Sequence, residues 1–97
     1  MEFLVLSSRC FRRPGRERAV MQAVMEASED LGAERVEARR GNVYSIGVYA
    51  KEGEKKILVY IDWDRDDWNW RRIYNQIVCS LQVQHPHQRK YGIEQTA

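Results

Sequence analysis

The segment DWDRDDWNWRR, residues 62–72, concentrates carboxylates, aromatic rings and guanidinium groups in eleven positions. A calcium-binding loop begins with carboxylates at alternate positions, which is the spacing of Asp62, Asp64 and Asp66. That loop also needs glycine at its sixth position and glutamate at its twelfth, where this chain has Asp67 and Ile73. The spacing therefore excludes an EF-hand. A magnesium site made of two or three of these carboxylates is the other metal hypothesis, but the sequence contains no second motif to accompany it.

The same segment also fits a strand that ends and a helix that begins. Asp66 or Asp67 would accept hydrogen bonds from the first N–H groups of the helix, where negative charge is favoured. Asp67 stands four residues before Arg71, which is a favourable spacing for an ion pair on a helix. We therefore interpret the segment as a turn and a helix cap rather than as a metal or catalytic site.

Trp68 is not explained by this interpretation. On a helix that begins near residue 67, Trp70 points into the apolar stripe, whereas Trp68 lies about 160° away, on the face of Arg72. An exposed Trp68 would stack on Arg72 and mark a contact surface, because tryptophan and arginine are enriched in binding hot spots. The alternative is that Trp68 folds back over the sheet edge.

A second concentration of charge lies in RCFRRPGRER, residues 9–18, between a predicted strand and a predicted helix. Arginine holds phosphate and carboxylate groups with a planar fork, and a helix N-terminus adds unpaired N–H groups and positive potential. The alternative is a solvated loop whose arginines pair with acidic residues of neighbouring turns. The first interpretation predicts an anion site formed by Arg12, Arg13, Arg16 and Arg18.

Cys10 and Arg16 have a Cys-x5-Arg spacing that resembles the phosphate loop of the cysteine phosphatases. The resemblance implies a thiolate nucleophile, activated by nearby positive charge, and an arginine that holds phosphate oxygens. It covers seven residues. Arg9 stands where that family often has histidine, and no serine or threonine follows Arg16.

A metal-dependent reaction is the other enzymatic hypothesis. Glu54-Lys55-Lys56 resembles the E-x-K core of many nucleases, which implies a bound metal with Glu37 as the second carboxylate. His85 and His87 lack the further ligands of a metal site. An enzyme is the least favoured class of function, and we expect no catalytic residue, cofactor or metal.

The composition is that of one globular domain: 97 residues, 43% hydrophobic, 31% charged, with a net charge of +2. This balance excludes a strongly basic protein, although twelve of the sixteen basic residues are arginine. The longest apolar runs, residues 3–6 and 57–61, are too short to span a bilayer, and the N-terminus does not resemble a secretion signal. We therefore expect a cytoplasmic protein with no membrane partner and with free thiols at Cys10 and Cys79.

Hydrophobic periodicity predicts six elements within residues 1–84, followed by a polar tail at residues 85–97. Gly41-Asn42 predicts a two-residue hairpin between the second and third strands. The order β-α-β-β-β-α predicts an α+β fold, a two-layer sandwich with a mostly antiparallel sheet and two helices. The predicted strands cover residues 3–7, 34–40, 43–50 and 56–62, and the predicted helices cover residues 16–31 and 67–84.

Two non-enzymatic functions remain open. The first is a domain that contacts nucleic-acid phosphates through the four arginines of the predicted anion site, helped by Arg71 and Arg72. Those four are Arg12, Arg13, Arg16 and Arg18. Helix, three strands, helix also resembles the topology of the double-stranded-RNA-binding domain, which implies phosphate contacts near the start of the last helix. The second is a protein-interaction or homodimer module. Its contacts would be Trp68 and an outer sheet face that carries Tyr49, Leu58 and Tyr60.

Overall fold

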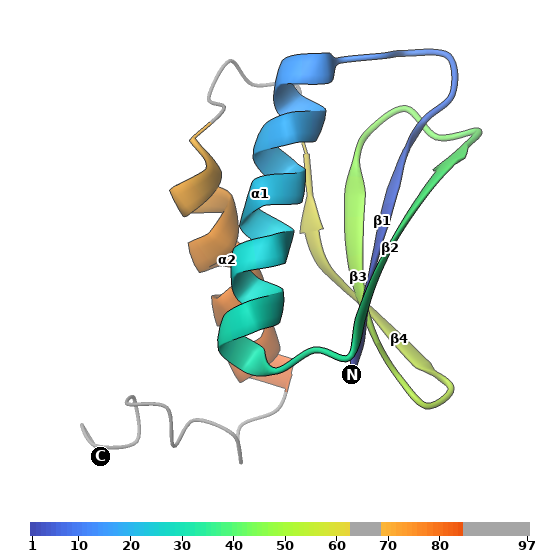
Figure 1. Ribbon diagram of the computed structural model, residues 1–97. Helices are drawn as coiled ribbons and strands as arrows, with labels where there is room; N and C mark the ends of the chain where they lie inside the picture. Colours follow the sequence, from blue (N-terminus) through green and yellow to red (C-terminus); the bar gives the residue numbers. More distant parts are fainter. Residues whose placement is uncertain (63–68, 85–97) are drawn as a thin grey trace.

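Two helices pack on one face of a four-stranded sheet in the computed structural model (Figure 1). The structure describes residues 1–62 and 69–84; Trp68 and the predicted tail lie outside these ranges. The predicted α+β class, with two layers and a mostly antiparallel sheet, is confirmed. The elements are β1 (Glu2–Ser8), α1 (Pro14–Leu31), β2 (Arg35–Gly41), β3 (Gly47–Glu52), β4 (Lys55–Ile61) and α2 (Trp70–Gln84).

The sheet has the order β2-β1-β3-β4, so β1 is an inner strand. It pairs in parallel with β2, with Phe3 opposite Val36, and antiparallel with β3, with Val5 opposite Val48. The strand is apolar on both faces, as its sequence predicts, and an inner position buries both faces and pairs both edges. The helix α1 returns the chain to the beginning of the sheet, which makes the β1–β2 pair parallel.

The predicted hairpin at Gly41-Asn42 is wrong. β1 separates β2 from β3, and residues 42–46 carry the chain across the end of β1. Gly41 continues β2 opposite Ser8, and neither Gly41 nor Asn42 has the positive φ that a tight hairpin turn requires. Tyr44 therefore lies in a connection, 83% exposed, and not on the core face of a strand.

The core lies between the sheet and the two helices. The predicted stripe of α1 is buried at Val20, Val24 and Ala27, and it packs with Phe3 of β1. α2 contributes Ile73, Ile77 and Leu81 to the same core. Gly32 ends α1 in the left-handed conformation, φ 68°, and its N–H donates to the Ser28 carbonyl, as expected of a C-terminal cap.

A β-bulge in β4 changes which residues face the helices. Tyr60 pairs with Val48 and Leu58 pairs with Tyr49, which leaves Val59 as an extra residue between them. Val59 and Tyr60 consequently both lie in the core. The predicted position of Tyr60 on the outer face is wrong, because strict alternation along a strand does not continue through a bulge. Leu58, 45% exposed, and the partly buried Tyr49 remain outside the core.

None of the helices in the described part of the chain is long and apolar enough to cross a membrane.

Candidate functional site

The carboxyl ends of β1, β2 and β4 meet the N-terminus of α1 at one end of the sheet, the upper end in Figure 1. Two connections close this end, residues 9–13 and residues 42–46. Backbone hydrogen bonds hold them: the Arg9 N–H donates to the Gly41 carbonyl at 3.0 Å, and the Asp62 N–H donates to the Ile46 carbonyl at 2.8 Å. We call this region, residues 8–18, 40–46 and 62, the arginine end.

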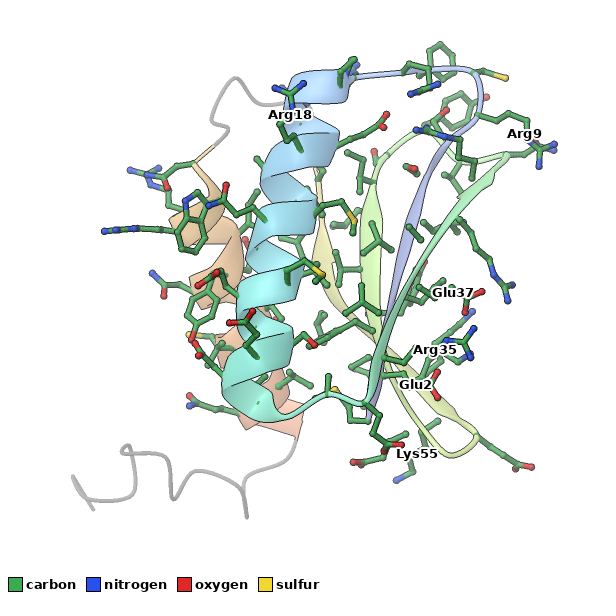
Figure 2. The ribbon with its side chains drawn as sticks, in the orientation of Figure 1. Glu2, Arg9, Arg18, Arg35, Glu37 and Lys55 are labelled. Atoms are coloured by element: carbon green, nitrogen blue, oxygen red, sulfur yellow. The ribbon has the colours of Figure 1, made fainter. Side chains whose placement is uncertain are left out.

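The arginine end carries far more positive than negative charge. Its carboxylates are Glu17 and Asp62 only. Figure 2 shows Arg9 and Arg18 at this end and Lys55 at the opposite end of the molecule. The arginines of the arginine end are Arg9, Arg12, Arg13, Arg16, Arg18 and Arg40.

Arg16 belongs to the interior of the molecule. Its side chain is 5% exposed, and Nη1 lies 3.4 Å from Oδ2 of Asp62, which is also buried. The Tyr60 hydroxyl donates to Oδ1 of the same carboxylate at 3.0 Å. These contacts tie the first turn of α1 to the end of β4. The guanidinium of Arg16 therefore does not form part of an exposed anion site, unlike what the sequence pattern suggested.

Glu17 occupies the position where the sequence predicts an external anion. Its carboxylate accepts the Arg13 N–H at 3.2 Å and Nη2 of Arg40 at 2.9 Å, and it lies 3.5 Å from Nε of Arg12. The hydrogen bond from Arg40 is the main cause that lowers the pKa of Glu17, against the opposing effect of burial. The chain thus supplies its own anion to this helix end. Arg12 pairs with an acidic residue, Glu17, which is the kind of contact that the alternative interpretation of the segment involves.

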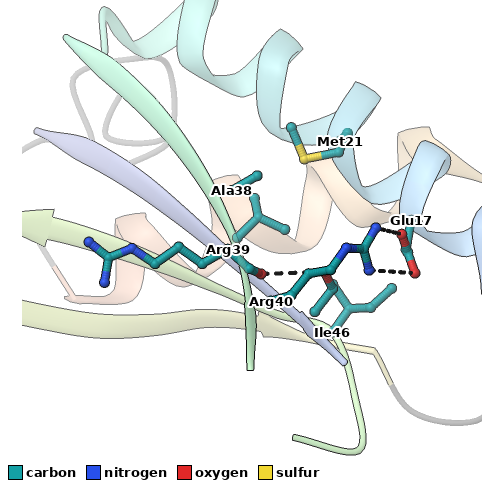
Figure 3. A pocket seen from close by; sticks show the side chains of 8 residues that line it. Glu17, Met21, Ala38, Arg39, Arg40 and Ile46 are labelled. Atoms are coloured by element: carbon teal, nitrogen blue, oxygen red, sulfur yellow. Dashed lines mark hydrogen bonds and ion pairs between the residues drawn. The ribbon is translucent and has the colours of Figure 1, made fainter. Parts of the chain in front are cut away.

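The Arg40–Glu17 pair forms one wall of a hollow between α1 and β2, which has a volume of about 150 Å³ (Figure 3). The other walls are mostly apolar and include Val5, Met21 and Ile46. Ala38 also lines the hollow and is exposed, although its place in the alternation predicts a buried position. Arg40 reaches across to α1 here, and its contact with Glu17 connects the edge strand to the helix.

Five arginines of the arginine end are exposed, and one of them, Arg40, also pairs with Glu17. The other four are Arg9, Arg12, Arg13 and Arg18. The edge strand β2 carries two further exposed arginines: Arg39, whose Nε pairs with Glu37, and Arg35, which lies opposite Glu2 in the strand register. Arg9 also donates from Nη2 to the Arg40 carbonyl at 3.4 Å, which joins the two parts. The parallel β1–β2 pairing places Arg9 beside the end of β2, the strand that carries Arg35 and Arg39.

An exposed aromatic pair lies among these arginines. Phe11 and Tyr44 are 52% and 83% exposed, and their ring centroids are 5.5 Å apart with the planes tilted by 35°. Both rings line two hollows of about 230 Å³ each. Hydrophobic periodicity does not reveal this pair, because it predicts that Tyr44 lies in a strand over residues 43–50.

The geometry gives little support to the enzymatic hypotheses. The N–H groups of Cys10 and Phe11 donate to Oγ of Ser8, at 3.2 and 2.8 Å, rather than converging on a site for phosphate. Cys10 is exposed. Glu54 lies in the β3–β4 turn, whereas Glu37 lies on the edge strand β2. Within the described residues, no group of three histidine, cysteine or acidic residues could hold a metal. Asp64, Asp66, His85 and His87 lie outside them.

α2 begins at Trp70, after the predicted start at residue 67, and the predicted stacking of Trp68 on Arg72 involves a residue outside the described ranges. Oδ1 of Asn69 accepts the Arg71 N–H at 2.9 Å, so Asn69 caps the helix; Asp66 and Asp67, the predicted caps, lie outside the described residues. The guanidinium of Arg71 lies 5.6 Å from the ring of Trp70.

Arg71 does not continue the basic surface of the arginine end. It lines a hollow between the helices together with Glu26 and Asp30 of α1. The Tyr74 hydroxyl donates to Oδ2 of Asp30, which raises the pKa of Tyr74 to about 12. The surroundings of Arg71 are therefore partly acidic, and Arg72 is exposed beside it.

Comparison with known protein families and with curated proteins finds no match for this chain.

We expect Arg16→Met to lower the free energy of unfolding by roughly 3–5 kcal/mol, because it leaves the Asp62 carboxylate buried without its cationic partner. Urea denaturation measures the loss. Arg18→Met, at an exposed position of the same helix, is the matched control and should change stability by less than about 0.5 kcal/mol. Equal effects of the two substitutions would show that the buried pair does not stabilise the fold.

The lowered pKa of Glu17 predicts the sign of a pH dependence. Its contribution to stability is fully present above the ordinary glutamate pKa of 4.5 and is lost as pH falls through the lower pKa of the folded state. Glu17→Gln should therefore reduce the free energy of unfolding at neutral pH, and its difference from wild type should shrink in acid. Urea denaturation at several pH values measures this. Glu29→Gln, an exposed control on α1, should show no such convergence; a constant Glu17→Gln difference down to pH 3 would contradict the assignment.

Proposed function

We propose that this protein is a non-enzymatic binding domain that contacts nucleic-acid phosphates through the arginine end. The observation that supports the proposal is the gathering of exposed guanidinium groups at one end of a molecule whose net charge is only +2. A gathered charge attracts an anionic partner to one surface even when the whole protein is nearly neutral.

The spread of the exposed arginines favours a chain of phosphates over a single anion. Arg9, Arg12 and Arg13 lie on the connection between β1 and α1, while Arg35 and Arg39 lie on β2. The last two are four residues apart, which corresponds to about 13 Å along a strand. One phosphate group cannot reach across this distance, whereas successive phosphates of a nucleic acid can.

The proposal changes the set of contact residues that the sequence suggested. Arg12, Arg13 and Arg18 stay in the set, and Arg9, Arg35 and Arg39 join it. Arg16 leaves it because it is buried against Asp62. Arg71 and Arg72 are at most secondary contacts, because Glu26 and Asp30 lie beside Arg71.

We expect the protein to bind nucleic acid with an affinity that falls steeply with salt, because phosphate contacts release counterions. Fluorescence anisotropy with labelled duplex and single-stranded oligonucleotides across a salt series measures the slope of log K against log salt. The double variant Arg12→Gln/Arg13→Gln should reduce the magnitude of that slope by about 1.8 for a duplex or about 1.4 for a single strand.

Lys55→Gln/Lys56→Gln removes the same charge at the opposite end of the molecule and is the matched control (Figure 2). It should leave the slope nearly unchanged. Wild-type protein that binds no nucleic acid at low salt would refute the proposal, and equal slopes for the two double variants would place the contact surface elsewhere.

Self-assembly through the helix-free face of the sheet is a second candidate function. Leu58 is 45% exposed there, and Tyr49 lies beside it in the register with its ring 5.0 Å from Nζ of Lys56. Tyr60 takes no part, because the bulge directs it into the core. Neighbouring apolar groups at the surface form the kind of contiguous patch that marks an interaction site.

If this face mediates a homodimer, the protein should sediment as a dimer at micromolar concentration, and Leu58→Glu should convert it to a monomer. Sedimentation velocity measures both, and Met25→Glu, at another exposed apolar position, is the control. A wild-type monomer over the whole concentration range would dispose of the candidate.

A further inference from the structure

The arginine end carries an aromatic pair that phosphate binding alone does not explain. Phe11 and Tyr44 belong to different connections, yet their rings are in contact and both remain largely exposed. Exposed rings are costly in water, since aromatic side chains contribute strongly to burial energy elsewhere in a fold. Phe11 lies between Arg9 and Arg13 in the sequence, and Arg13 lines one hollow together with both rings. This arrangement points to a ligand that offers both charge and a planar apolar surface.

The rings rest on connections that hydrogen bonds fix. The Phe11 N–H donates to Oγ of Ser8 at 2.8 Å, and Nη1 of Arg40 donates to the Ser8 carbonyl at 3.3 Å. The Arg9 N–H donates to the Gly41 carbonyl just before the connection that carries Tyr44. Such anchoring reduces the loss of conformational freedom when a ligand binds the rings.

The hollows beside the rings suit one planar group each. Their volumes of about 230 Å³ fall below the roughly 300–1,000 Å³ of pockets that enclose a whole small molecule. Asn42 lines one hollow, and the polar residues Arg13, Ser45 and Asp62 line the other. An asparagine amide both donates and accepts hydrogen bonds, which matches the polar edge of a nucleobase.

We propose that the arginine end binds single-stranded nucleic acid, with an unpaired base stacked on Tyr44 and Phe11 and its neighbouring phosphates on Arg9, Arg12 and Arg13. This inference rests on the proposed function and specifies its ligand. Bases inside a duplex have no free face, whereas every unpaired base offers one, and stacking on an aromatic side chain tolerates any sequence. The combination of a basic surface with aromatic rings is that of a single-strand binding surface.

The test compares Tyr44→Leu with Tyr44→Phe, because leucine removes the ring and phenylalanine keeps it. Fluorescence anisotropy is measured with a labelled single-stranded oligonucleotide and with the corresponding duplex, at one low salt concentration and across a salt series. Tyr44→Leu should weaken single-strand binding on the order of 5- to 100-fold, and Tyr44→Phe should retain it. Phe11→Leu should resemble Tyr44→Leu, whereas Met25→Ala, at an exposed apolar position of α1 outside the arginine end, should leave affinity unchanged.

Two further measurements separate stacking from charge. Duplex affinity should not change in Tyr44→Leu, and the salt slope for the single strand should also stay constant, since no phosphate contact is removed. Thermal unfolding verifies that each variant is folded, as expected at exposed positions.

The outcomes distinguish this inference from the function on which it rests. Salt-sensitive binding that is indifferent to Tyr44→Leu and Phe11→Leu, or that is as tight for the duplex as for the single strand, would overturn the inference and leave phosphate binding intact. No binding of either oligonucleotide at low salt would overturn both. A change of oligomeric state in Tyr44→Leu, measured by sedimentation, would instead assign the rings to a protein contact.

Discussion

The architecture depends on the burial of β1 on both faces and its pairing on both edges. A strand apolar on both sides is stable only inside a sheet, so β2 and β3 must lie on either side of it. The chain then has to cross the end of β1 between β2 and β3. This crossing brings residues 42–46 beside the β1–α1 connection and thereby creates the arginine end.

Two carboxylates divide the arginines of that end into structural and surface groups. Asp62 holds Arg16 in the interior, while Glu17 pairs with Arg40 and Arg12 across the start of α1. Removing an unpaired charge from water is strongly unfavourable, and an opposite charge offsets part of that cost. The buried Arg16 accordingly lies against an aspartate. The side chains of Arg9, Arg12, Arg13 and Arg18 stay at the surface.

Phe11 and Tyr44 have the role of an exposed aromatic contact surface, which the sequence suggested for Trp68. Trp68 itself lies outside the described residues. They supply an exposed aromatic surface, and they supply it beside the arginines of the β1–α1 connection rather than at the start of α2. Phosphate contact and base stacking are complementary, because one binds the backbone of a nucleic acid and the other its bases. The proposed surface thus joins both kinds of contact within one end of the sheet.

The sequence by itself determined the elements, the α+β class and the buried stripe of α1, because hydrophobic period and a glycine cap are local signals. It also located the arginine cluster before α1. Strand order, the bulge that turns Tyr60 inward, and the burial of Arg16 were decided by tertiary structure alone. β1 pairs with two strands that are distant from it in the sequence. The local turn signal at Gly41-Asn42 contains no information about this pairing. The contact between Phe11 and Tyr44 joins positions 33 residues apart, so no spacing in the sequence reveals it.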